Sequence, residues 1–265
     1  MYSAFQLALK FARYYVTAAN GKGHGIHSPF VFEFIERVLN DTAVYPEYAN
    51  IEAVRQQLLQ NNTEITIEDM GAGSAVIGSK QRKVKAIAAS SLKPKKFAQL
   101  LFRMVQYYKP ATILELGTSL GVTTAYLASA NRAATVVTGE GSAAIANRAT
   151  QNFQSLGLTN IHQVLGNFDQ TLGEILHTHP SFDFIFIDGN HRKAPTLRYF
   201  EQLLPHTHAS TLFVFDDIHW SEEMEAAWAQ IKAHPMVTVS IDLFFIGIIG
   251  INPNIKVKQD FSIRF

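Results

Sequence analysis

Three largely apolar segments constrain the fold of this chain more than any other feature. They cover residues 113–116, 182–187 and 211–215, and a glycine or an acidic residue follows each of them. In these segments apolar residues follow one another and do not alternate with polar ones. This pattern is typical of strands that are buried on both faces of a parallel sheet. In open parallel sheets, ligands bind at the carboxyl ends of the strands. We therefore expect an α/β fold with a ligand site where these segments end.

The remaining segments complete an alternating pattern of strands and helices. Further strands are predicted at residues 134–138 and 161–165, and helices at 122–130, 142–157, 169–177, 194–204 and 222–233. Such alternation predicts right-handed crossovers and a doubly wound, seven-stranded, mostly parallel sheet. Residues 237–244 and 245–251 follow each other without a helix, so we expect an antiparallel hairpin at the sheet edge. The alternating residues 260–265 could add a short strand.

The first ninety residues have a different character, because helical patterns dominate there. We expect helices at 4–18, 29–39, 49–60 and 84–89, and a further helix follows at 95–108. The glycine-rich residues 70–74 are interpreted as a loop, since no convincing apolar helix follows them. We divide the chain into a helical, substrate-binding extension at 1–90 and a ligand-binding α/β domain at 91–265.

Composition excludes several classes of protein. The chain has 265 residues, a net charge of +1 and no cysteine, which rules out disulfides, thiolate nucleophiles and cysteine-ligated zinc. The first ten residues lack the basic start of a signal peptide, so a cytoplasmic protein is expected. The apolar residues 243–249 are too few to cross a bilayer, and we expect no membrane association.

A glycine-rich turn joins the first of the three strands to a helix. Glu115, Gly117 and Gly121 form the pattern E-x-G-x-x-x-G, which differs from the G-x-G-x-x-G of dinucleotide enzymes. The acid before the turn suits a ligand that carries an amino group and lacks a pyrophosphate. S-adenosylmethionine fits that description, whereas a plain connection between strand and helix is the alternative that needs no ligand.

From about residue 112 to the end, the chain resembles class I S-adenosylmethionine-dependent methyltransferases, and most closely the small-molecule O-methyltransferases related to catechol O-methyltransferase. The resemblance implies a methyltransferase domain at 91–265 that acts on a small hydroxylated molecule, and it leaves a homodimer open. It also implies that the turn holds the methionine part of the cofactor, that an acid after the second strand binds the ribose, and that residues after the third strand contact adenine. The matching residues are Glu115, Gly117, Thr118, Gly121, Glu140, Gly166, Asn167, Phe168 and Asp188.

The same family uses a divalent metal to lower the pKa of the acceptor hydroxyl. The matching positions after the fourth and fifth strands are Asp188, Asp216 and Asp217, and an oxygen-only ligand set favours Mg²⁺. The family usually has Asp-Asn where this chain has Asp216-Asp217. His191 stands where the catechol enzymes have a lysine, so it is the candidate general base; the simpler interpretation is that Asn190 and His191 cap the following helix. For His219 we favour a structural role.

A basic segment of the chain suggests a different kind of substrate, a nucleic acid. Residues 80–109 contain nine lysines and arginines and no acid, so an RNA methyltransferase is the alternative function, with a solvated helix face as the simpler interpretation. Because no RNA-binding motif accompanies the segment, we expect no nucleic acid partner. A non-catalytic scaffold with this fold is the second alternative. A nicotinamide enzyme is disfavoured because the third glycine of its fingerprint is missing.

Overall fold

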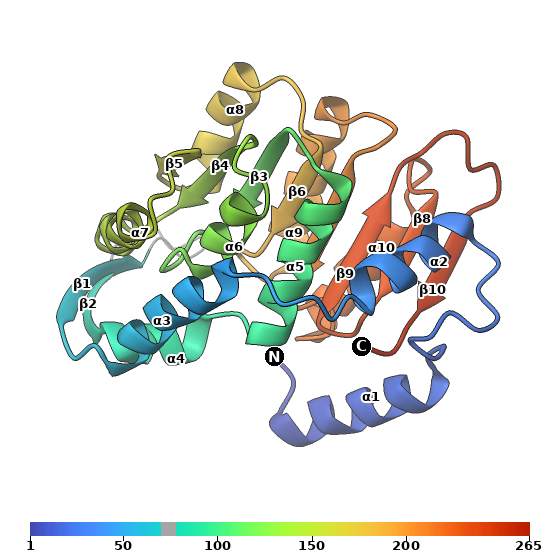
Figure 1. The fold of residues 1–265 in the computed structure, drawn as a ribbon, viewed down its shortest axis with the longest axis horizontal. Coiled ribbons are helices and arrows are strands. Elements are labelled where there is room, and N and C mark those ends of the chain that lie inside the picture. Colours follow the sequence, from blue (N-terminus) through green and yellow to red (C-terminus); the bar gives the residue numbers. More distant parts are fainter. Residues whose placement is uncertain (70–77) are drawn as a thin grey trace. The chain divides into compact units, whose positions relative to one another are not determined.

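The computed structural model describes residues 1–69 and 78–265 (Figure 1). The chain divides into two compact units: a terminal unit of Met1–Asp41 with Ser181–Phe265, and a central unit of Thr42–Pro180. Neither boundary coincides with the predicted one at residue 90. The loop predicted at residues 70–74 lies outside the described residues.

The central unit contains the glycine turn and three parallel strands in the order β3-β4-β5. These strands are β3 (Thr112–Leu116), β4 (Thr135–Glu140) and β5 (Ile161–Leu165), with Leu114 paired to Val137 and Val137 to His162. Helices α6 (Val122–Ala130), α7 (Ala143–Ser155) and α8 (Phe168–Thr178) follow them in turn. All nine residues of α6 are buried, which explains its unbroken run of small and apolar side chains.

The rest of the central unit lies earlier in the chain. It comprises α3 (Glu47–Gln60), β1 (Glu64–Asp69), β2 (Gly78–Lys83), α4 (Val84–Ser91) and α5 (Lys95–Tyr108). Helix α5 has the predicted bounds, because Pro94 precedes it and Lys109, at φ 49°, ends it just before Pro110. Strand β2 was not predicted. Its sequence, GSKQRK, has no apolar alternation, and its backbone pairs antiparallel with β1.

The terminal unit contains five strands in the order β10-β8-β9-β7-β6. Strands β6 (Phe184–Ile187) and β7 (Leu212–Asp216) are parallel, and β9 (Ile246–Gly250) pairs antiparallel with β7. The predicted hairpin is formed by β8 (Val239–Asp242) and β9, and β10 (Gln259–Ser262) joins β8 in parallel. The described residues thus confirm the predicted α/β class with eight main strands, one more than the seven expected, because the C-terminal segment does form β10.

Six helical segments complete the terminal unit. They are α1 (Ala4–Thr17), α2 (Pro29–Phe34), the π-helix η1 (Ile35–Leu39), α9 (Lys193–Leu203) with the 3₁₀ turn η2 (Leu204–His206), and α10 (Glu222–Ala233). Helix α1 begins at a capping box between Ser3 and Gln6. Its Tyr14 packs on Phe244, and the Tyr14 hydroxyl donates to the carbonyl of Ile263. In the described part of the chain, no helix is both long enough and apolar enough to cross a membrane.

Candidate active site

The glycine turn after β3 has a backbone that requires glycine at two positions. Gly117 has φ 116° and Gly121, which caps α6, has φ 78°, a region that side chains disfavour. The amides of Gly117 and Thr118 both donate to the carbonyl of Gly139, at 3.1 and 2.9 Å. A Cβ atom at Gly121 would lie 2.5 Å from the ring of Phe153. The turn is therefore held tightly against the end of β4 and against α7.

Glu115 lies inside the protein beneath this turn, with no solvent exposure. Its Oε2 atom accepts hydrogen bonds from the hydroxyls of Thr124, at 2.5 Å, and Thr138, at 2.6 Å. Its Oε1 atom is buried and has no hydrogen-bond partner among the described residues. Burial raises the pKa of Glu115 to about 7, although the two threonine bonds and the charge of Lys93 oppose the rise. A direct contact between Glu115 and a ligand would require this cluster to open.

Glu140 ends β4, at the place expected for the acid that binds the ribose. Its two oxygens accept backbone hydrogen bonds from Ser119 and Ser142, both at 2.9 Å. Burial raises the pKa of Glu140, against the lowering effect of these amides. Each carboxylate oxygen can accept more than one hydrogen bond, so the side chain can be fixed by the backbone and still bind hydroxyl groups.

The predicted adenine-contacting residues follow β5 and lie near the same turn. Gly166 has φ 140°, and the side chain of Asn167 caps α8 by accepting from the amide of Asp169 at 3.0 Å. Phe168 packs over Gly139, where an added Cβ atom would lie 2.8 Å from its ring. Because Gly139 also accepts the amides of the glycine turn, the structure brings the turn, the end of β4 and Phe168 together.

A second group of polar residues lies in the terminal unit at the ends of β6 and β7. Asp188, His191 and Asp216 each offer a ligand atom, and these three atoms lie within 4.8 Å of one another. Ile187 pairs with Phe215 in the parallel ladder, so the carboxylates that follow them emerge side by side. Asp216 is 5% exposed. Two carboxylates and an imidazole are a donor set that fits a divalent cation.

Asp217 stands apart from this group of three, although the sequence placed it among the metal ligands. Its Oδ2 atom lies 4.0 Å from Nδ1 of His191, whereas Oδ1 of Asp188 lies 3.8 Å from Nε2. Asp188 and Asp217 thus lie near the two different ring nitrogens of His191, and the imidazole joins Asp188 and Asp216 in the candidate ligand group. The simpler interpretation of His191 as a helix cap does not match the structure, because α9 is capped at Arg192 with no side-chain hydrogen bond.

His219 lies in a polar network that sequence reasoning missed. Its ring nitrogens lie 2.9 Å from Glu225 and 2.8 Å from Asp242. Burial lowers the pKa of His219, but the bonds and charges of Asp242 and Glu225 outweigh it and leave the pKa raised. No local spacing in the sequence connects His219 with Asp242, so only the folded chain could show the pairing.

The basic segment at residues 80–109 is not a uniform charged surface. Lys93 and Arg103 are 7% and 8% exposed. Burial and the neighbouring charge of Arg103 lower the pKa of Lys96. Two cations of the segment therefore belong to the interior of the central unit, which weakens its interpretation as a nucleic acid footprint.

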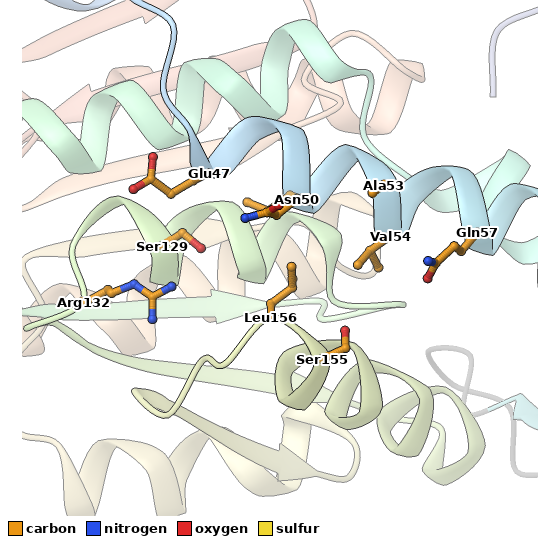
Figure 2. Close-up of a pocket in the computed structure, with 10 residues that line it drawn as sticks. Glu47, Asn50, Ala53, Val54, Gln57, Ser129, Arg132, Ser155 and Leu156 are labelled. Atoms are coloured by element: carbon orange, nitrogen blue, oxygen red, sulfur yellow. The ribbon is translucent and has the colours of Figure 1, made fainter.

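A cavity of about 390 Å³ lies away from the predicted site residues (Figure 2). It is bounded by α3 and by the C-terminal ends of α6 and α7, and Figure 2 shows Leu156 pointing toward α3. The carboxyl ends of the strands meet the N-terminal ends of these helices, so the cavity is at the opposite edge. Its lining residues are Glu47, Asn50, Ile51, Ala53, Val54, Gln57, Ser129, Arg132, Ser155 and Leu156.

Comparison with known proteins finds similarity to methyltransferases. Residues 114–218 match the family model described as a methyltransferase domain. The fold is similar to that of the Podospora anserina methyltransferase PaMTH1 bound to S-adenosylhomocysteine, at 16% identity over 86% of this chain and 99% of that chain, with a TM-score of 0.60. No curated protein matches the sequence.

Two further solved structures share the fold. The O-methyltransferase from Bacillus cereus, in complex with S-adenosylhomocysteine, is 20% identical over 83% of this chain and 97% of that chain, with a TM-score of 0.56. The O-methyltransferase TomG from Streptomyces achromogenes, in complex with S-adenosylmethionine, is 18% identical over 61% of this chain and 82% of that chain, with a TM-score of 0.52. Residues 114–218 therefore match a methyltransferase domain, and the chain shares its fold with structures of methyltransferases bound to S-adenosylmethionine or S-adenosylhomocysteine.

Proposed function

We propose that this protein transfers the methyl group of S-adenosylmethionine to a hydroxyl oxygen of a small molecule, with the help of a divalent cation. The observation that carries the proposal is the group of Asp188, His191 and Asp216, at the carboxyl ends of two adjacent parallel strands. Similar folds that are named O-methyltransferases support the choice of oxygen as acceptor.

The cofactor is assigned to the central unit. Gly117 and Thr118 lie on the turn that would take the methionine part, and Glu140 is fixed by two amides in a position to accept hydroxyl groups of the ribose. Phe168 offers a half-buried aromatic ring for adenine, next to Gly166 and Asn167. These contacts are proposals that rest on the resemblance and on the closeness of the residues.

The acceptor hydroxyl has to lose its proton for methyl transfer. A bound divalent cation would supply Lewis acidity that lowers the pKa of this hydroxyl. Asp188 and Asp216 would hold the cation, and His191 would accept the proton. The C–S bond of the sulfonium breaks with its electron pair left on sulfur as the new O–C bond forms, which gives S-adenosylhomocysteine and a methyl ether.

His191 has two possible tasks in this proposal. Its ring is 34% exposed, so it is accessible to an acceptor molecule as a base, and it also lies within reach of a cation held by Asp188. We assign it as the base. His191→Ala should then keep cation affinity and lose roughly 10²–10⁴-fold in rate, the usual contribution of a positioned base. A loss of cation affinity as large as that in Asp216→Ala would assign it as a ligand instead.

Binding experiments test the cofactor and the cation separately. Calorimetry should give a dissociation constant for S-adenosylhomocysteine near micromolar, roughly −8 kcal/mol, with no competition from NAD. Electron paramagnetic resonance should detect Mn²⁺ binding to the native protein, and Asp216→Asn should abolish it without changing affinity for S-adenosylhomocysteine. Asp260→Asn is the matched control, because this aspartate is 54% exposed and pairs with Lys232. Full activity in EDTA would reduce the proposal to a metal-independent O-methyltransferase.

The acceptor can be sought with a panel of catechols and other small hydroxylated molecules, with and without Mn²⁺. Methyl transfer to one of them, with a methyl ether as the product, would support the proposal. Transfer to RNA, with salt-sensitive RNA binding, would favour the alternative function instead.

A further inference from the structure

The backbone of Asp217 adopts a conformation that the surrounding structure has to maintain. Asp217 has φ 55°, in the left-handed region that non-glycine residues rarely occupy. Its amide donates to the carbonyl of Phe245 at 2.7 Å, and its carbonyl accepts from the amide of Trp220 at 2.9 Å. The position of Asp217, directly after Asp216, therefore depends on the turn that contains Phe245.

That turn, between β8 and β9, is fixed by Asp242. Its Oδ1 atom accepts from the amide of Phe244 at 2.8 Å, and Phe244 itself has φ 70°. Its Oδ2 atom lies 2.8 Å from Nε2 of His219 and 3.2 Å from the indole nitrogen of Trp228. His219 also stacks on the ring of Phe244, with centroids 5.0 Å apart. His219 thus joins the turn to the loop that follows β7.

Helix α1 reaches the same network through Glu225. Oε1 of Glu225 lies 2.9 Å from Nδ1 of His219, while the Tyr2 hydroxyl donates to Oε2 at 2.7 Å. Lys10 donates to both carboxylate oxygens, at 3.0 and 2.9 Å. The amide of Tyr2 donates directly to the carbonyl of Trp220 at 3.1 Å. Two residues of the N-terminal segment therefore hold the loop that carries Asp217.

We infer that the N-terminal segment, Tyr2 together with helix α1, positions the candidate cation site. Tyr2 and Lys10 fix Glu225 and His219, and these hold the β8–β9 turn and the loop after β7 in the conformation that presents Asp216 and Asp217. Tyr2, Lys10, Glu225 and His219 are positioning residues and touch no reacting atom. The inference rests on the proposed function, because it assumes that the group at Asp188 and Asp216 binds a cation.

The test uses substitutions on α1 and the residues before it, far in sequence from the carboxylates. Tyr2→Phe with Lys10→Met removes the two donors on the N-terminal segment from Glu225 and leaves Asp188, His191 and Asp216 in place. The fold should survive, since Lys10 is 35% exposed and surface ion pairs contribute little to stability. Arg13→Met is the matched control, because it removes an exposed cation from the same helix without touching Glu225.

Mn²⁺ affinity is read by electron paramagnetic resonance, together with amide hydrogen exchange at residues 217–220. The double variant should bind Mn²⁺ about tenfold more weakly, the lower end of the range for partners that orient metal ligands. Exchange in the loop should be faster, and affinity for S-adenosylhomocysteine should not change. Arg13→Met should match the native protein in all three measurements.

Each contrary outcome has its own meaning. Native Mn²⁺ affinity in the double variant would overturn the positioning role and leave the cation site standing. No Mn²⁺ binding by the native protein would overturn both. An equal loss of affinity for Mn²⁺ and for S-adenosylhomocysteine would indicate general destabilisation and would also overturn the inference.

Discussion

The hydroxyl of Thr138 on β4 donates a 2.6 Å hydrogen bond to the buried carboxylate of Glu115 on the neighbouring strand β3. The same oxygen accepts from Thr124 on α6, and the Thr118 hydroxyl of the glycine turn lies 2.6 Å from that of Thr138. One carboxylate therefore connects two strands, a turn and a helix. Buried polar clusters of this kind fix the geometry of a core only when their donors and acceptors are hydrogen-bonded. The protonation of Glu115 therefore affects the stability of the fold.

Glu115→Gln should change the pH dependence of stability. The pKa of Glu115 is raised from 4.5 to about 7, so between these values the native protein holds a proton that the unfolded chain has lost. Glu115 therefore contributes stability at low pH that is lost as pH rises to 7, on the order of 3 kcal/mol. A glutamine side chain does not titrate, so the variant lacks this pH-dependent contribution. In urea denaturation, the variant should gain stability relative to the native protein between pH 5 and pH 8; parallel pH curves would contradict the prediction.

Gly121→Ala should destabilise the fold more than Gly157→Ala. Both glycines have positive φ, 78° and 62°, so both substitutions strain the backbone by about 1–2 kcal/mol. Only at Gly121 does the added Cβ atom meet a neighbour, the ring of Phe153 at 2.5 Å; nothing lies within 4 Å at Gly157. Overpacking at Gly121 should lower the free energy of unfolding by a further ~1–3 kcal/mol. Equal unfolding free energies for the two variants would show that the ring moves aside freely.

Gly139→Ala should weaken cofactor binding through Phe168. The added Cβ atom would lie 2.8 Å from the Phe168 ring, which would have to tilt away from its position after β5. The dissociation constant for S-adenosylhomocysteine, measured by calorimetry, should rise. The dissociation constant for 5′-methylthioadenosine, which keeps the adenine, should rise by a similar factor. An unchanged constant for both ligands would remove Phe168 from the proposed adenine site.

Arg55→Met should cost far more stability than Arg37→Met. The Arg55–Glu52 pair, at 2.9 Å, has side chains only 8% and 18% exposed, and Tyr126 also donates to Glu52. Removing one partner of a buried pair costs about 3–5 kcal/mol because the other charge is left uncompensated. The Arg37–Glu36 pair is 63% and 58% exposed, and its loss should cost roughly 0–1 kcal/mol. Thermal unfolding of both variants measures the difference, and similar losses would contradict it.

Segments with strong local patterns were predicted well. Helices α5 and α10 have the predicted bounds, and the strands after which Asp188 and Asp216 stand were found from their apolar runs. Strand β2 was missed because its residues are polar and its pairing with β1 is made by the backbone. The segment predicted as one helix at 29–39 changes to a π-helix at Ile35, and no pattern of residues in the sequence predicts this change.

The sequence by itself determined the alternation of strands and helices, the glycine turn and the carboxylates at strand ends, because periodicity and backbone freedom are local properties. Only the tertiary structure decided what each charged side chain faces. Burial and two threonines made Glu115 an internal support. Strand pairing placed Asp188 beside Asp216, and the loop after β6 brought His191 to them, with Asp217 near the Nδ1 atom of its ring. The Glu225–His219–Asp242 network joins segments that are distant in sequence, so it exists only once the chain has folded.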